Sequence, residues 1–412
     1  MENLLLKAPP VHEAYDTTVS AFHAYLDEVL DWFASQDDSY TQIDLAARTG
    51  PYAAEALGFR IALKIAESHR ILGSIGEPVT VTLLNPVYKE TGRMQTRENH
   101  PHGEDSIRYK MGALRRLEAL NPNLSCRFFV IDDECPDASG RMAQTILTQE
   151  FPDAWESGNA RVCFLGEAID RPDPALPPGL THKDGPNRSV KGGALLLGMR
   201  QALSDDVPGL HVIIDNDADL SVHPEQIGLL IEAILAGTAR AVAGSRREPD
   251  SVSLIGGSRN VRGRLFIQIW QHLLPQLASH ITDTNRAFKA FSRPALQAVI
   301  DRIESYTFPY QIELLQACVS EHIPLEKRGI AYIDSEAAST QQGEAIMDTY
   351  LNQIRQIADI ARRYQTIAPD DALLHYLLSI SERDWRQIES NPPDDLKDLA
   401  GACGPHSARP GN

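Results

Sequence analysis

Cysteine is scarce in this sequence, and it contains no long apolar run. The chain has five cysteines, no two of them spaced as Cys-x-x-Cys. An odd number without that spacing argues against a disulfide framework and a zinc site, and it predicts a reduced, cytoplasmic protein. No apolar stretch approaches the roughly 18 residues that a membrane-spanning helix requires, so the sequence predicts no transmembrane segment.

Positive charge is also in deficit. Lysine and arginine total 39 against 56 aspartate and glutamate residues, which gives a formal net charge of −17. Such a surface repels phosphate backbones, so general binding to nucleic acid or to anionic membranes is disfavoured, whereas a local basic pocket stays compatible. With 412 residues and 42% hydrophobic content, the chain can build a full core in two to three domains, or in one large domain with extensions.

The most informative stretch is apolar at first and acidic afterwards. Val212–Ile214 predicts a short buried strand, and Asp215, Asp217 and Asp219 follow it at alternate positions. Residues i and i+2 of an extended chain share a face, so Asp217 and Asp219 are expected to converge at the carboxyl end of the strand. Such a pair suits Mg²⁺ or Mn²⁺, with substrate phosphates completing the ligand shell. An acidic turn that caps the next helix is the alternative interpretation.

Other polar motifs follow predicted strands in the same manner. The strands at 79–84, 126–131 and 241–245 lead into Pro86–Glu90, Asp132-Asp133 and Arg246-Arg247. Helices are predicted over about residues 106–120, 139–149, 190–203, 223–236 and 265–277, with a last strand over 330–333. This alternation, with ligand-type residues at strand carboxyl ends, indicates an α/β fold with a largely parallel sheet. Lys191-Gly192-Gly193 opens the third helix, where a lysine at a helix N-terminus favours an anion.

Helical periodicity flanks this α/β region on both sides. We expect an N-terminal helical extension over 1–74, the α/β domain over 75–340, a C-terminal helical extension over 341–390 and a disordered tail over 391–412. The N-terminal extension is interpreted as an accessory bundle that packs on a neighbouring domain or on a second subunit. Its apolar stripes therefore also offer an interface for a homodimer.

In this order, the motifs resemble those of the GT-A fold glycosyltransferases of family two, and are most similar to the dolichyl-phosphate mannosyltransferase-like branch. The resemblance covers about residues 77–338 and rests on Pro86–Glu90, Asp132-Asp133, Lys191–Ala194, Asp217-Ala218-Asp219, and Asp283-Thr284 with Phe288–Phe291. It implies a Rossmann-like, mostly parallel sheet. It also implies metal-dependent transfer of a sugar from a UDP- or GDP-linked donor to an acceptor, with inversion at the anomeric carbon.

The resemblance further implies a role for each matching residue. The nucleotide-sugar pocket is expected to comprise Pro86, Tyr88, Glu90, Asp132, Asp133, Lys191, Asp217 and Asp219. Asp217 and Asp219 are the expected ligands of the Mg²⁺ or Mn²⁺ ion. Asp283 is the first choice for the base that deprotonates the acceptor, and Glu313 is the second. The structural alternatives are a helix N-cap or a loop ion pair with Arg286 for Asp283, and a buried pair with an arginine for Glu313.

The acceptor side departs from the family pattern. Arg246 matches an arginine that faces the acceptor phosphate in lipid-phosphate relatives, but Arg286 and Ala287 replace a small residue and a glycine. Arg286 thus adds a cation, and the acceptor stays open between a sugar, a small molecule and a lipid phosphate. Because no C-terminal membrane helix is predicted, a soluble acceptor or a peripheral encounter with lipid at the inner membrane face is expected.

Two other functions stay open at this point. The first is a sugar-nucleotide nucleotidyltransferase, against which the lack of glycine between Asn85 and Glu90 counts. The second is a catalytically inactive GT-A scaffold protein, against which Lys191 and the Asp217–Asp219 pair count.

Overall fold

The computed structural model describes residues 1–9, 20–171, 176–254, 260–284, 286–334 and 345–390. The expected disordered tail over 391–412 lies outside these residues. In the part of the chain that is described, no helix is long and apolar enough to cross a membrane.

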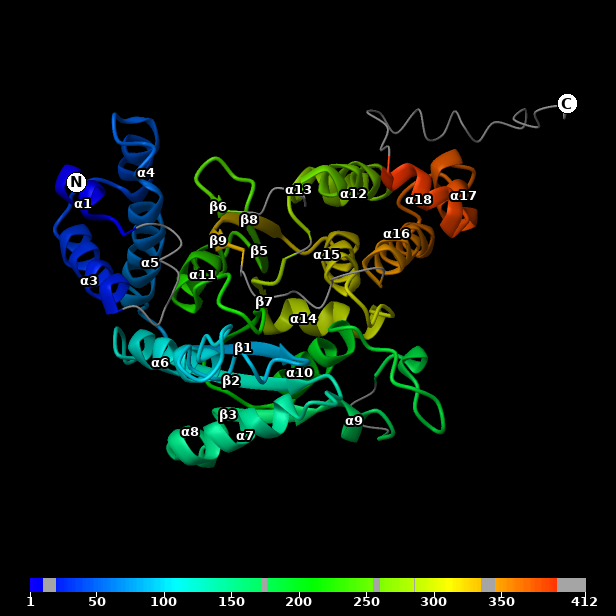
Figure 1. Ribbon diagram of the computed structural model, residues 1–412, viewed down its shortest axis with the longest axis horizontal. Helices are drawn as coiled ribbons and strands as arrows, with labels where there is room; N and C mark the ends of the chain where they lie inside the picture. The colour runs from blue at the N-terminus through cyan, green and yellow to red at the C-terminus, as the bar shows by residue number, and fades with distance from the viewer. Residues whose placement is uncertain (10–19, 172–175, 255–259, 285, 335–344, 391–412) are drawn as a thin grey trace, which may run out of the picture.

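A seven-stranded sheet in the order β3-β2-β1-β4-β7-β5-β8 forms the centre of the molecule (Figure 1). The strands are β1 (Val79–Val87), β2 (Leu124–Asp132), β3 (Ala160–Phe164), β4 (Leu210–Asp215), β5 (Ala241–Ser245), β7 (Lys289–Ser292) and β8 (Leu325–Gly329). Neighbouring strands are parallel except for β7, which is antiparallel to both β4 and β5. The predicted α/β fold with a mostly parallel sheet is confirmed.

Helices cover both faces of this sheet. The main ones are α6 (Ser106–Glu118), α7 (Ser139–Glu150) and α11 (Ile227–Leu235) on one face, and α10 (Gly192–Ser204) on the other. In β2, Phe128 and Val130 belong to the apolar core on the face of α6, α7 and α11. Phe129 and Ile131 belong to the core on the face of α10, because successive side chains of a strand point to opposite faces. Burial on both faces explains why these strands are continuous apolar runs in the sequence.

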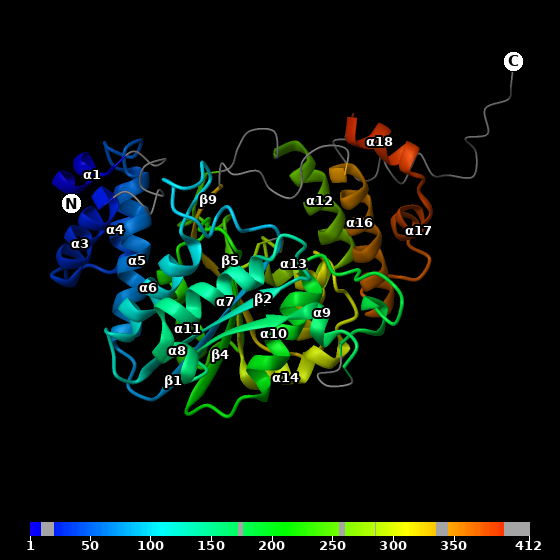
Figure 2. The same ribbon diagram turned by 60° about the horizontal axis from the view of Figure 1, so that its bottom comes forward.

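The N-terminal helices and the C-terminal helices lie on opposite sides of the sheet (Figures 1 and 2). The N-terminal group is α1 (Glu2–Lys7), α3 (Ser20–Ala34), α4 (Tyr40–Thr49) and α5 (Leu57–Gly73). Helix α5 is buried along most of its length and packs on α11 and on a small parallel sheet of β6 (Val252–Leu254) and β9 (Ala331–Ile333). Val252 and Ala331 belong to the same apolar core as the N-terminal helices, so these helices form one packed body with the α/β region.

The C-terminal part of the chain supplies the remaining long helices. These are α12 (Asn260–Leu273), α13 (Pro275–His280), α14 (Arg293–Val299), α15 (Tyr310–Ser320), α16 (Ala345–Arg363), α17 (Ala372–Ser379) and α18 (Glu382–Ser390). Helix α16 packs on α12, α15 and α17. The short elements are α8 (Pro152–Glu156), α9 (Leu165–Ala168), η1 (Pro178–Leu180), η2 (Pro224–Gln226) and η4 (Ile300–Arg302).

Two predicted elements differ from the structure, and one strand was not predicted. The helix expected over 265–277 is divided between α12 and α13, because Pro275 starts a new helix. The strand expected over 330–333 is β9, preceded directly by β8, and the two strands pair with different partners. Strand β7 was not predicted, since its four residues lie within a segment that was interpreted as an acceptor-side motif.

Candidate active site

Four of the predicted motifs meet at the carboxyl edge of the sheet. Strands β1 and β2 end side by side, with Val87 opposite Asp132, and β4 ends on the other side of β1 at Asp215. Helix α10 begins at the same edge, because Lys191 contacts both Asp133 and Asp217. Open α/β sheets bind their ligands at this edge.

Lys191 joins the acidic motifs that follow β2 and β4. Its backbone N–H donates to Asp133 Oδ2 at 2.7 Å, and its ammonium group pairs with Asp217 Oδ1. The residue has a φ of +68°, a conformation that is uncommon outside glycine and is frequent at functional positions. Gly192 then lies so close to Tyr306 that a Cβ would meet its carbonyl carbon at 2.5 Å. The local backbone therefore directs both polar groups of Lys191 toward the site.

Asp132 and Asp133 are adjacent but differently engaged. Both oxygens of Asp132 accept backbone N–H groups, from Cys135 at 2.9 Å and from Gly140 at 2.7 Å, so Asp132 holds the start of α7. Oδ1 of Asp133 is buried and has no hydrogen-bond partner among the described residues. Burial raises the pKa of Asp133 to about 6. Because an unpartnered buried carboxylate oxygen is costly, Asp133 is the acid of this pair that is placed to accept a hydrogen bond from a ligand.

The acidic pair lies on a turn and not on an extended strand. Strand β4 ends at Asp215, and the chain bends over residues 218–220. Asp219 Oδ1 accepts hydrogen bonds from the backbone N–H and the hydroxyl of Ser221, at 3.1 and 2.5 Å. Burial alone would raise the pKa of Asp217, but the positive charges of Lys191 and Arg286 outweigh burial and lower it to about 2. The argument from an extended chain was therefore wrong in its geometry, while Asp217 is held ionised at the sheet edge.

Lys110 is a functional candidate that the sequence analysis missed. It lies on α6, is fully buried, and donates to the backbone carbonyl of Asp217 and to Asn85 Oδ1. Burial lowers its pKa to about 8, although nearby acids, Asp219 first among them, oppose that shift. The signal was present, because Lys110 occupies the apolar stripe of its helix together with Ile107 and Leu114. A lysine on a buried stripe needs a polar partner in the interior.

An ion-pair network joins the loop after β1 to the acidic turn. Glu90 pairs with Arg93 at 2.6 Å, and Arg93 pairs with Glu104 at the same distance. Glu104 Oε2 accepts the backbone N–H of Leu220 at 3.0 Å. Burial raises the pKa of Glu90. This network gives Glu90 a role in holding the turn that carries Asp219.

The two other residues predicted after β1 differ in exposure. Pro86 is buried within β1, opposite Ile131, and shapes the end of the strand. Tyr88 is 40% exposed, with the ammonium group of Lys89 lying 5.7 Å from its ring centroid. Tyr88 therefore presents an aromatic face at the rim of the site, where a ligand ring would be able to stack.

A second cluster of charges follows β5. Arg246 binds Asp283 through two hydrogen bonds of 2.6 and 2.8 Å. Burial opposes ionisation of Asp283, but the hydrogen bonds and charge of Arg246 prevail and lower its pKa to about 2. The guanidinium groups of Arg246 and Arg286 lie 5.2 and 4.6 Å from the ring centroid of Tyr332. Nε of Arg286 is buried without a hydrogen-bond partner in the described part of the chain.

Two other acids of the sequence analysis serve the framework. Asp215 is fully buried and accepts the N–H of Lys289 at 2.6 Å and the hydroxyl of Tyr310 at 3.0 Å, so it joins β4 to β7 and α15. The structure does not bring Glu313 to the carboxyl-edge cluster. Glu313 pairs with Arg363 of α16 at 2.6 Å and accepts the N–H of Ser305 at 2.8 Å, which matches its structural alternative.

The acidic turn fits a divalent cation only with help from a ligand. Among the described residues, no group of three or more histidine, cysteine or acidic side chains is arranged to hold a metal. Asp217 and Asp219 thus supply at most two carboxylates. Mg²⁺ and Mn²⁺ sites of phosphate-handling enzymes are commonly of this kind, with the substrate phosphates as the remaining ligands.

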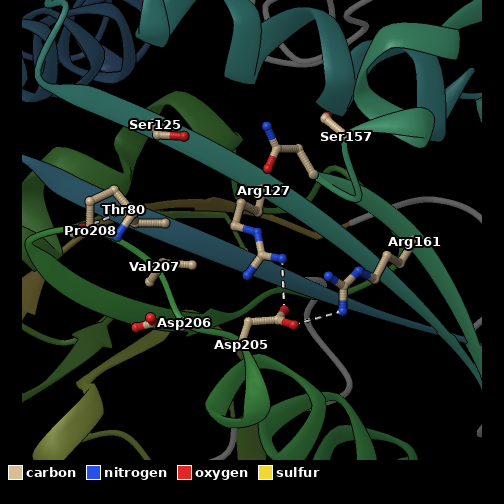
Figure 3. A pocket seen from close by; sticks show the side chains of 10 residues that line it. Thr80, Ser125, Arg127, Ser157, Arg161, Asp205, Asp206, Val207 and Pro208 are labelled. Carbon is tan, nitrogen blue, oxygen red and sulfur yellow. Dashed lines mark hydrogen bonds and ion pairs between the residues drawn. The ribbon is translucent and has the colours of Figure 1, made fainter.

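A pocket of about 290 Å³ lies at the opposite, amino edge of the sheet, between β1, β2, β3 and the loop before β4. Figure 3 shows Arg127 and Arg161 converging on Asp205 within it, at 2.7 and 3.0 Å. Asp205 binds both guanidinium groups and ties β2 and β3 to that loop. We interpret this pocket as a structural junction, since the predicted site residues lie at the other edge.

The mostly parallel α/β sheet, with an acidic turn and a lysine-led helix at its carboxyl edge, is the arrangement that the resemblance to the GT-A fold implies. Residues 165–299 match the family model described as Glycosyl transferase family 2, a stretch that includes Lys191, Asp217, Asp219 and Asp283. This match covers about a third of the chain.

Two relatives extend the comparison. An undecaprenyl-phosphate mannosyltransferase of Micrococcus luteus is 30% identical over 191 residues, which cover 45% of this chain and 63% of the relative. Glycosyltransferase AglD of Haloferax volcanii is 24% identical over 237 residues, covering 58% of this chain and 30% of the relative. The chain thus spans less than two thirds of the length of either protein.

Among solved structures, glucosyl-3-phosphoglycerate synthase from Mycobacterium tuberculosis, in complex with Mn²⁺, UDP and glucosyl-3-phosphoglycerate, aligns with a TM-score of 0.45 and 16% identity. The alignment covers 74% of this chain and 85% of that one.

Asp133→Asn should stabilise the protein at neutral pH while weakening the site. The folded-state pKa of about 6 lies above the ordinary value of 3.8, so burying the carboxylate costs stability that grows between pH 4 and 6 and is fully present above pH 6. Asparagine removes that cost, and the free energy of unfolding at pH 7.5 should rise by about 1–3 kcal/mol. The gain should vanish at pH 4. Urea denaturation at both pH values measures it, and an equal loss of stability at both would contradict the assignment.

Proposed function

We propose that this protein is a metal-dependent glycosyltransferase that moves a sugar from a nucleotide-diphosphate sugar to an anionic acceptor. The meeting of Asp133, Lys191 and Asp217 at the carboxyl edge of the sheet supports this function best. These groups combine an acceptor for nucleotide hydroxyls, a cation for phosphates and an ionised acid for a metal. UDP- and GDP-linked sugars are the two donor classes that the sequence pattern implies.

On the donor side, Asp133 Oδ1 would accept a hydrogen bond from the ribose or the base, and Tyr88 would lie against the nucleotide at the rim. Asp217 and Asp219 would hold Mg²⁺ or Mn²⁺ together with the diphosphate. When bound, the ion stabilises the negative charge that develops on the leaving diphosphate. Lys191 lies beside Asp217 and adds a preorganised positive charge for the same oxygens.

On the acceptor side, Arg286 offers an incompletely bonded guanidinium group that faces the charges of Asp217 and Asp219. Arg246 lies on the same tyrosine ring, so two cations are available to a phosphate or a carboxylate. A lipid phosphate is one such acceptor, in keeping with the name of the Micrococcus relative. A phosphorylated sugar or another small anion satisfies the same chemistry.

Asp283 is the proposed base. Its pKa of about 2 makes it a weak base while Arg246 holds both of its oxygens. An anionic acceptor that draws Arg246 toward itself would remove this partner, and the pKa of the buried carboxylate would rise. Asp283 would then take the proton of the acceptor hydroxyl as that oxygen attacks the anomeric carbon, with the inversion that family two implies. A positioned base contributes on the order of 10²–10⁴-fold to such a step.

A thermal-shift screen with UDP, GDP and their sugar conjugates, with and without Mn²⁺, tests this function. A ligand bound only by the folded state stabilises it by RT ln(1 + [L]/Kd), about 2.7 kcal/mol at a hundredfold excess over Kd. We expect one nucleotide series to raise the melting temperature, and Mn²⁺ to increase the effect. Folded protein that responds to no nucleotide would refute the transferase function and favour the scaffold alternative.

A further inference from the structure

A buried lysine of the N-terminal helices is bonded to the acceptor side of the site. Lys64 lies on α5, and its side chain is 1% exposed. Its ammonium group donates to the Tyr40 hydroxyl at 2.7 Å, to Asp250 Oδ2 at 3.0 Å and to the Gly329 carbonyl at 2.9 Å. All three protons are therefore used, and the three acceptors come from three separate segments of the chain.

One of these segments, from Arg246 to Ser251, links β5 to β6 and carries Asp250. Asp250 accepts the Tyr40 hydroxyl at 3.2 Å in addition to the bond from Lys64. Arg60, one turn before Lys64 on α5, donates to the carbonyls of Asp250 and Ser251 at 3.0 and 3.3 Å. The end of the segment that begins with Arg246 is thus fixed by two cations of α5.

The second segment runs from β8 to β9 and carries Tyr332. Gly329 ends β8, and it lies so close to Asp250 that a Cβ would meet Asp250 Oδ1 at 2.2 Å. Three residues later the Tyr332 ring receives the guanidinium groups of Arg246 and Arg286. Lys64 therefore donates hydrogen bonds both to the segment that begins with Arg246 and to the segment that carries Tyr332, whose ring contacts Arg246.

A buried lysine at this position lowers the stability of the fold unless its hydrogen bonds compensate for the loss of hydration. Burying an ammonium group carries a desolvation penalty, and an apolar side chain of similar size often gives equal or greater stability. All three ammonium protons of Lys64 have acceptors, and a buried polar network that is fully satisfied in this way holds the surrounding segments in one arrangement.

We propose that Lys64 and Arg60 are positioning residues, through which the N-terminal helices set Arg246 and Tyr332 for binding the anionic group of the acceptor. The inference rests on the proposed function for the identity of that ligand. It gives the helical extension a role in the acceptor side of the site, and none in donor binding.

Hydrogen–deuterium exchange on the full chain tests the positioning without any ligand. In Lys64→Met, peptides that cover residues 246–251 and 329–334 should exchange at least tenfold faster, while those covering 130–135 and 212–221 should be unchanged. Lys7→Met is the matched control, because Lys7 belongs to the same helical group but forms an exposed ion pair with Glu28 at 3.2 Å. A uniform rise in exchange, or none in the two segments, would overturn the inference.

Calorimetry with inorganic phosphate, in the presence of the stabilising nucleotide, supplies the functional readout. Lys64→Met should weaken phosphate binding at least tenfold and leave the nucleotide Kd within twofold, whereas Lys7→Met should change neither. Equal loss of both affinities would indicate a merely structural role, and unchanged phosphate affinity, or none in the wild type, would refute the proposal. If no nucleotide binds, the proposed function fails while the exchange result still decides the positioning. Asp250→Asn carries the same expectations should Lys64→Met not fold.

Discussion

Asp217→Asn should lower sugar transfer by about 10²–10³-fold, the usual effect of removing one preorganised electrostatic group from an active site. Asparagine keeps the size of the side chain and loses the charge that faces Lys191 and, in the proposed complex, the divalent ion. The Asp217 side chain is 22% exposed and belongs to a turn, so the core is not disturbed by the exchange. The loss should therefore appear in turnover and in metal binding, and losing the ion pair with Lys191 should also lower the free energy of unfolding at neutral pH.

Initial rates and Mn²⁺ titrations with the nucleotide sugar from the thermal-shift screen measure this effect. Asp206→Asn is the matched control, because Asp206 is an exposed acid on the loop before the same strand, at the opposite edge of the sheet. It should transfer sugar at the wild-type rate. Wild-type Mn²⁺ affinity in Asp217→Asn would show that the acidic turn does not hold the ion.

Arg246→Met should cost about 3–5 kcal/mol of stability, because it leaves a buried carboxylate without its partner. Asp283 is 4% exposed, and both of its oxygens are bound by Arg246. The double variant Arg246→Met/Asp283→Leu should recover most of the loss, since an apolar pair replaces the charges. Urea denaturation of the two single variants and the double variant at pH 7 measures the coupling.

The pH dependence of this loss has a definite sign. In the wild type, the depressed pKa of Asp283 gives stability that is present above its ordinary value and is lost as the pH falls toward about 2. In Arg246→Met, the pKa of the unpaired carboxyl should be raised by burial, so that variant gains stability as it protonates. The difference between the two proteins should narrow as the pH is lowered from 7 toward 4. A constant difference would mean that the ion pair is not the source of the loss.

Patterns that are local in the chain predicted much of this molecule. Buried parallel strands are continuous apolar runs, so the strand that ends at Asp215 and the strand at 241–245 were identifiable. Strand β7 was not, because four residues inserted antiparallel between β4 and β5 carry no periodicity of their own. Its place depends on the pairing of Asp215 with the Lys289 N–H, a contact between distant segments.

The division of roles among similar acids depended on tertiary contacts. Asp132 and Asp133 are equivalent in the sequence, but only Asp132 lies within reach of the backbone N–H groups at the start of α7. Glu313 became a framework residue because α16, whose position no local pattern reveals, brings Arg363 to it. Lys64 and Lys110 share this property: each lies on a helical face that the fold buries, and their partners come from other elements.

The shared core of α5, β6 and β9 also bears on how this protein is divided. The sequence boundary near residue 75 separates the N-terminal helices from the α/β region. In the structure, side chains from both regions, including Phe59, Ala62 and Ala331, pack in one core. The α/β region therefore has apolar side chains on the side of α5 that only the N-terminal helices cover. A chimera that exchanged it for the corresponding region of a relative would have to restore the apolar packing against α5. Insertions are tolerated better in loops that no helix covers.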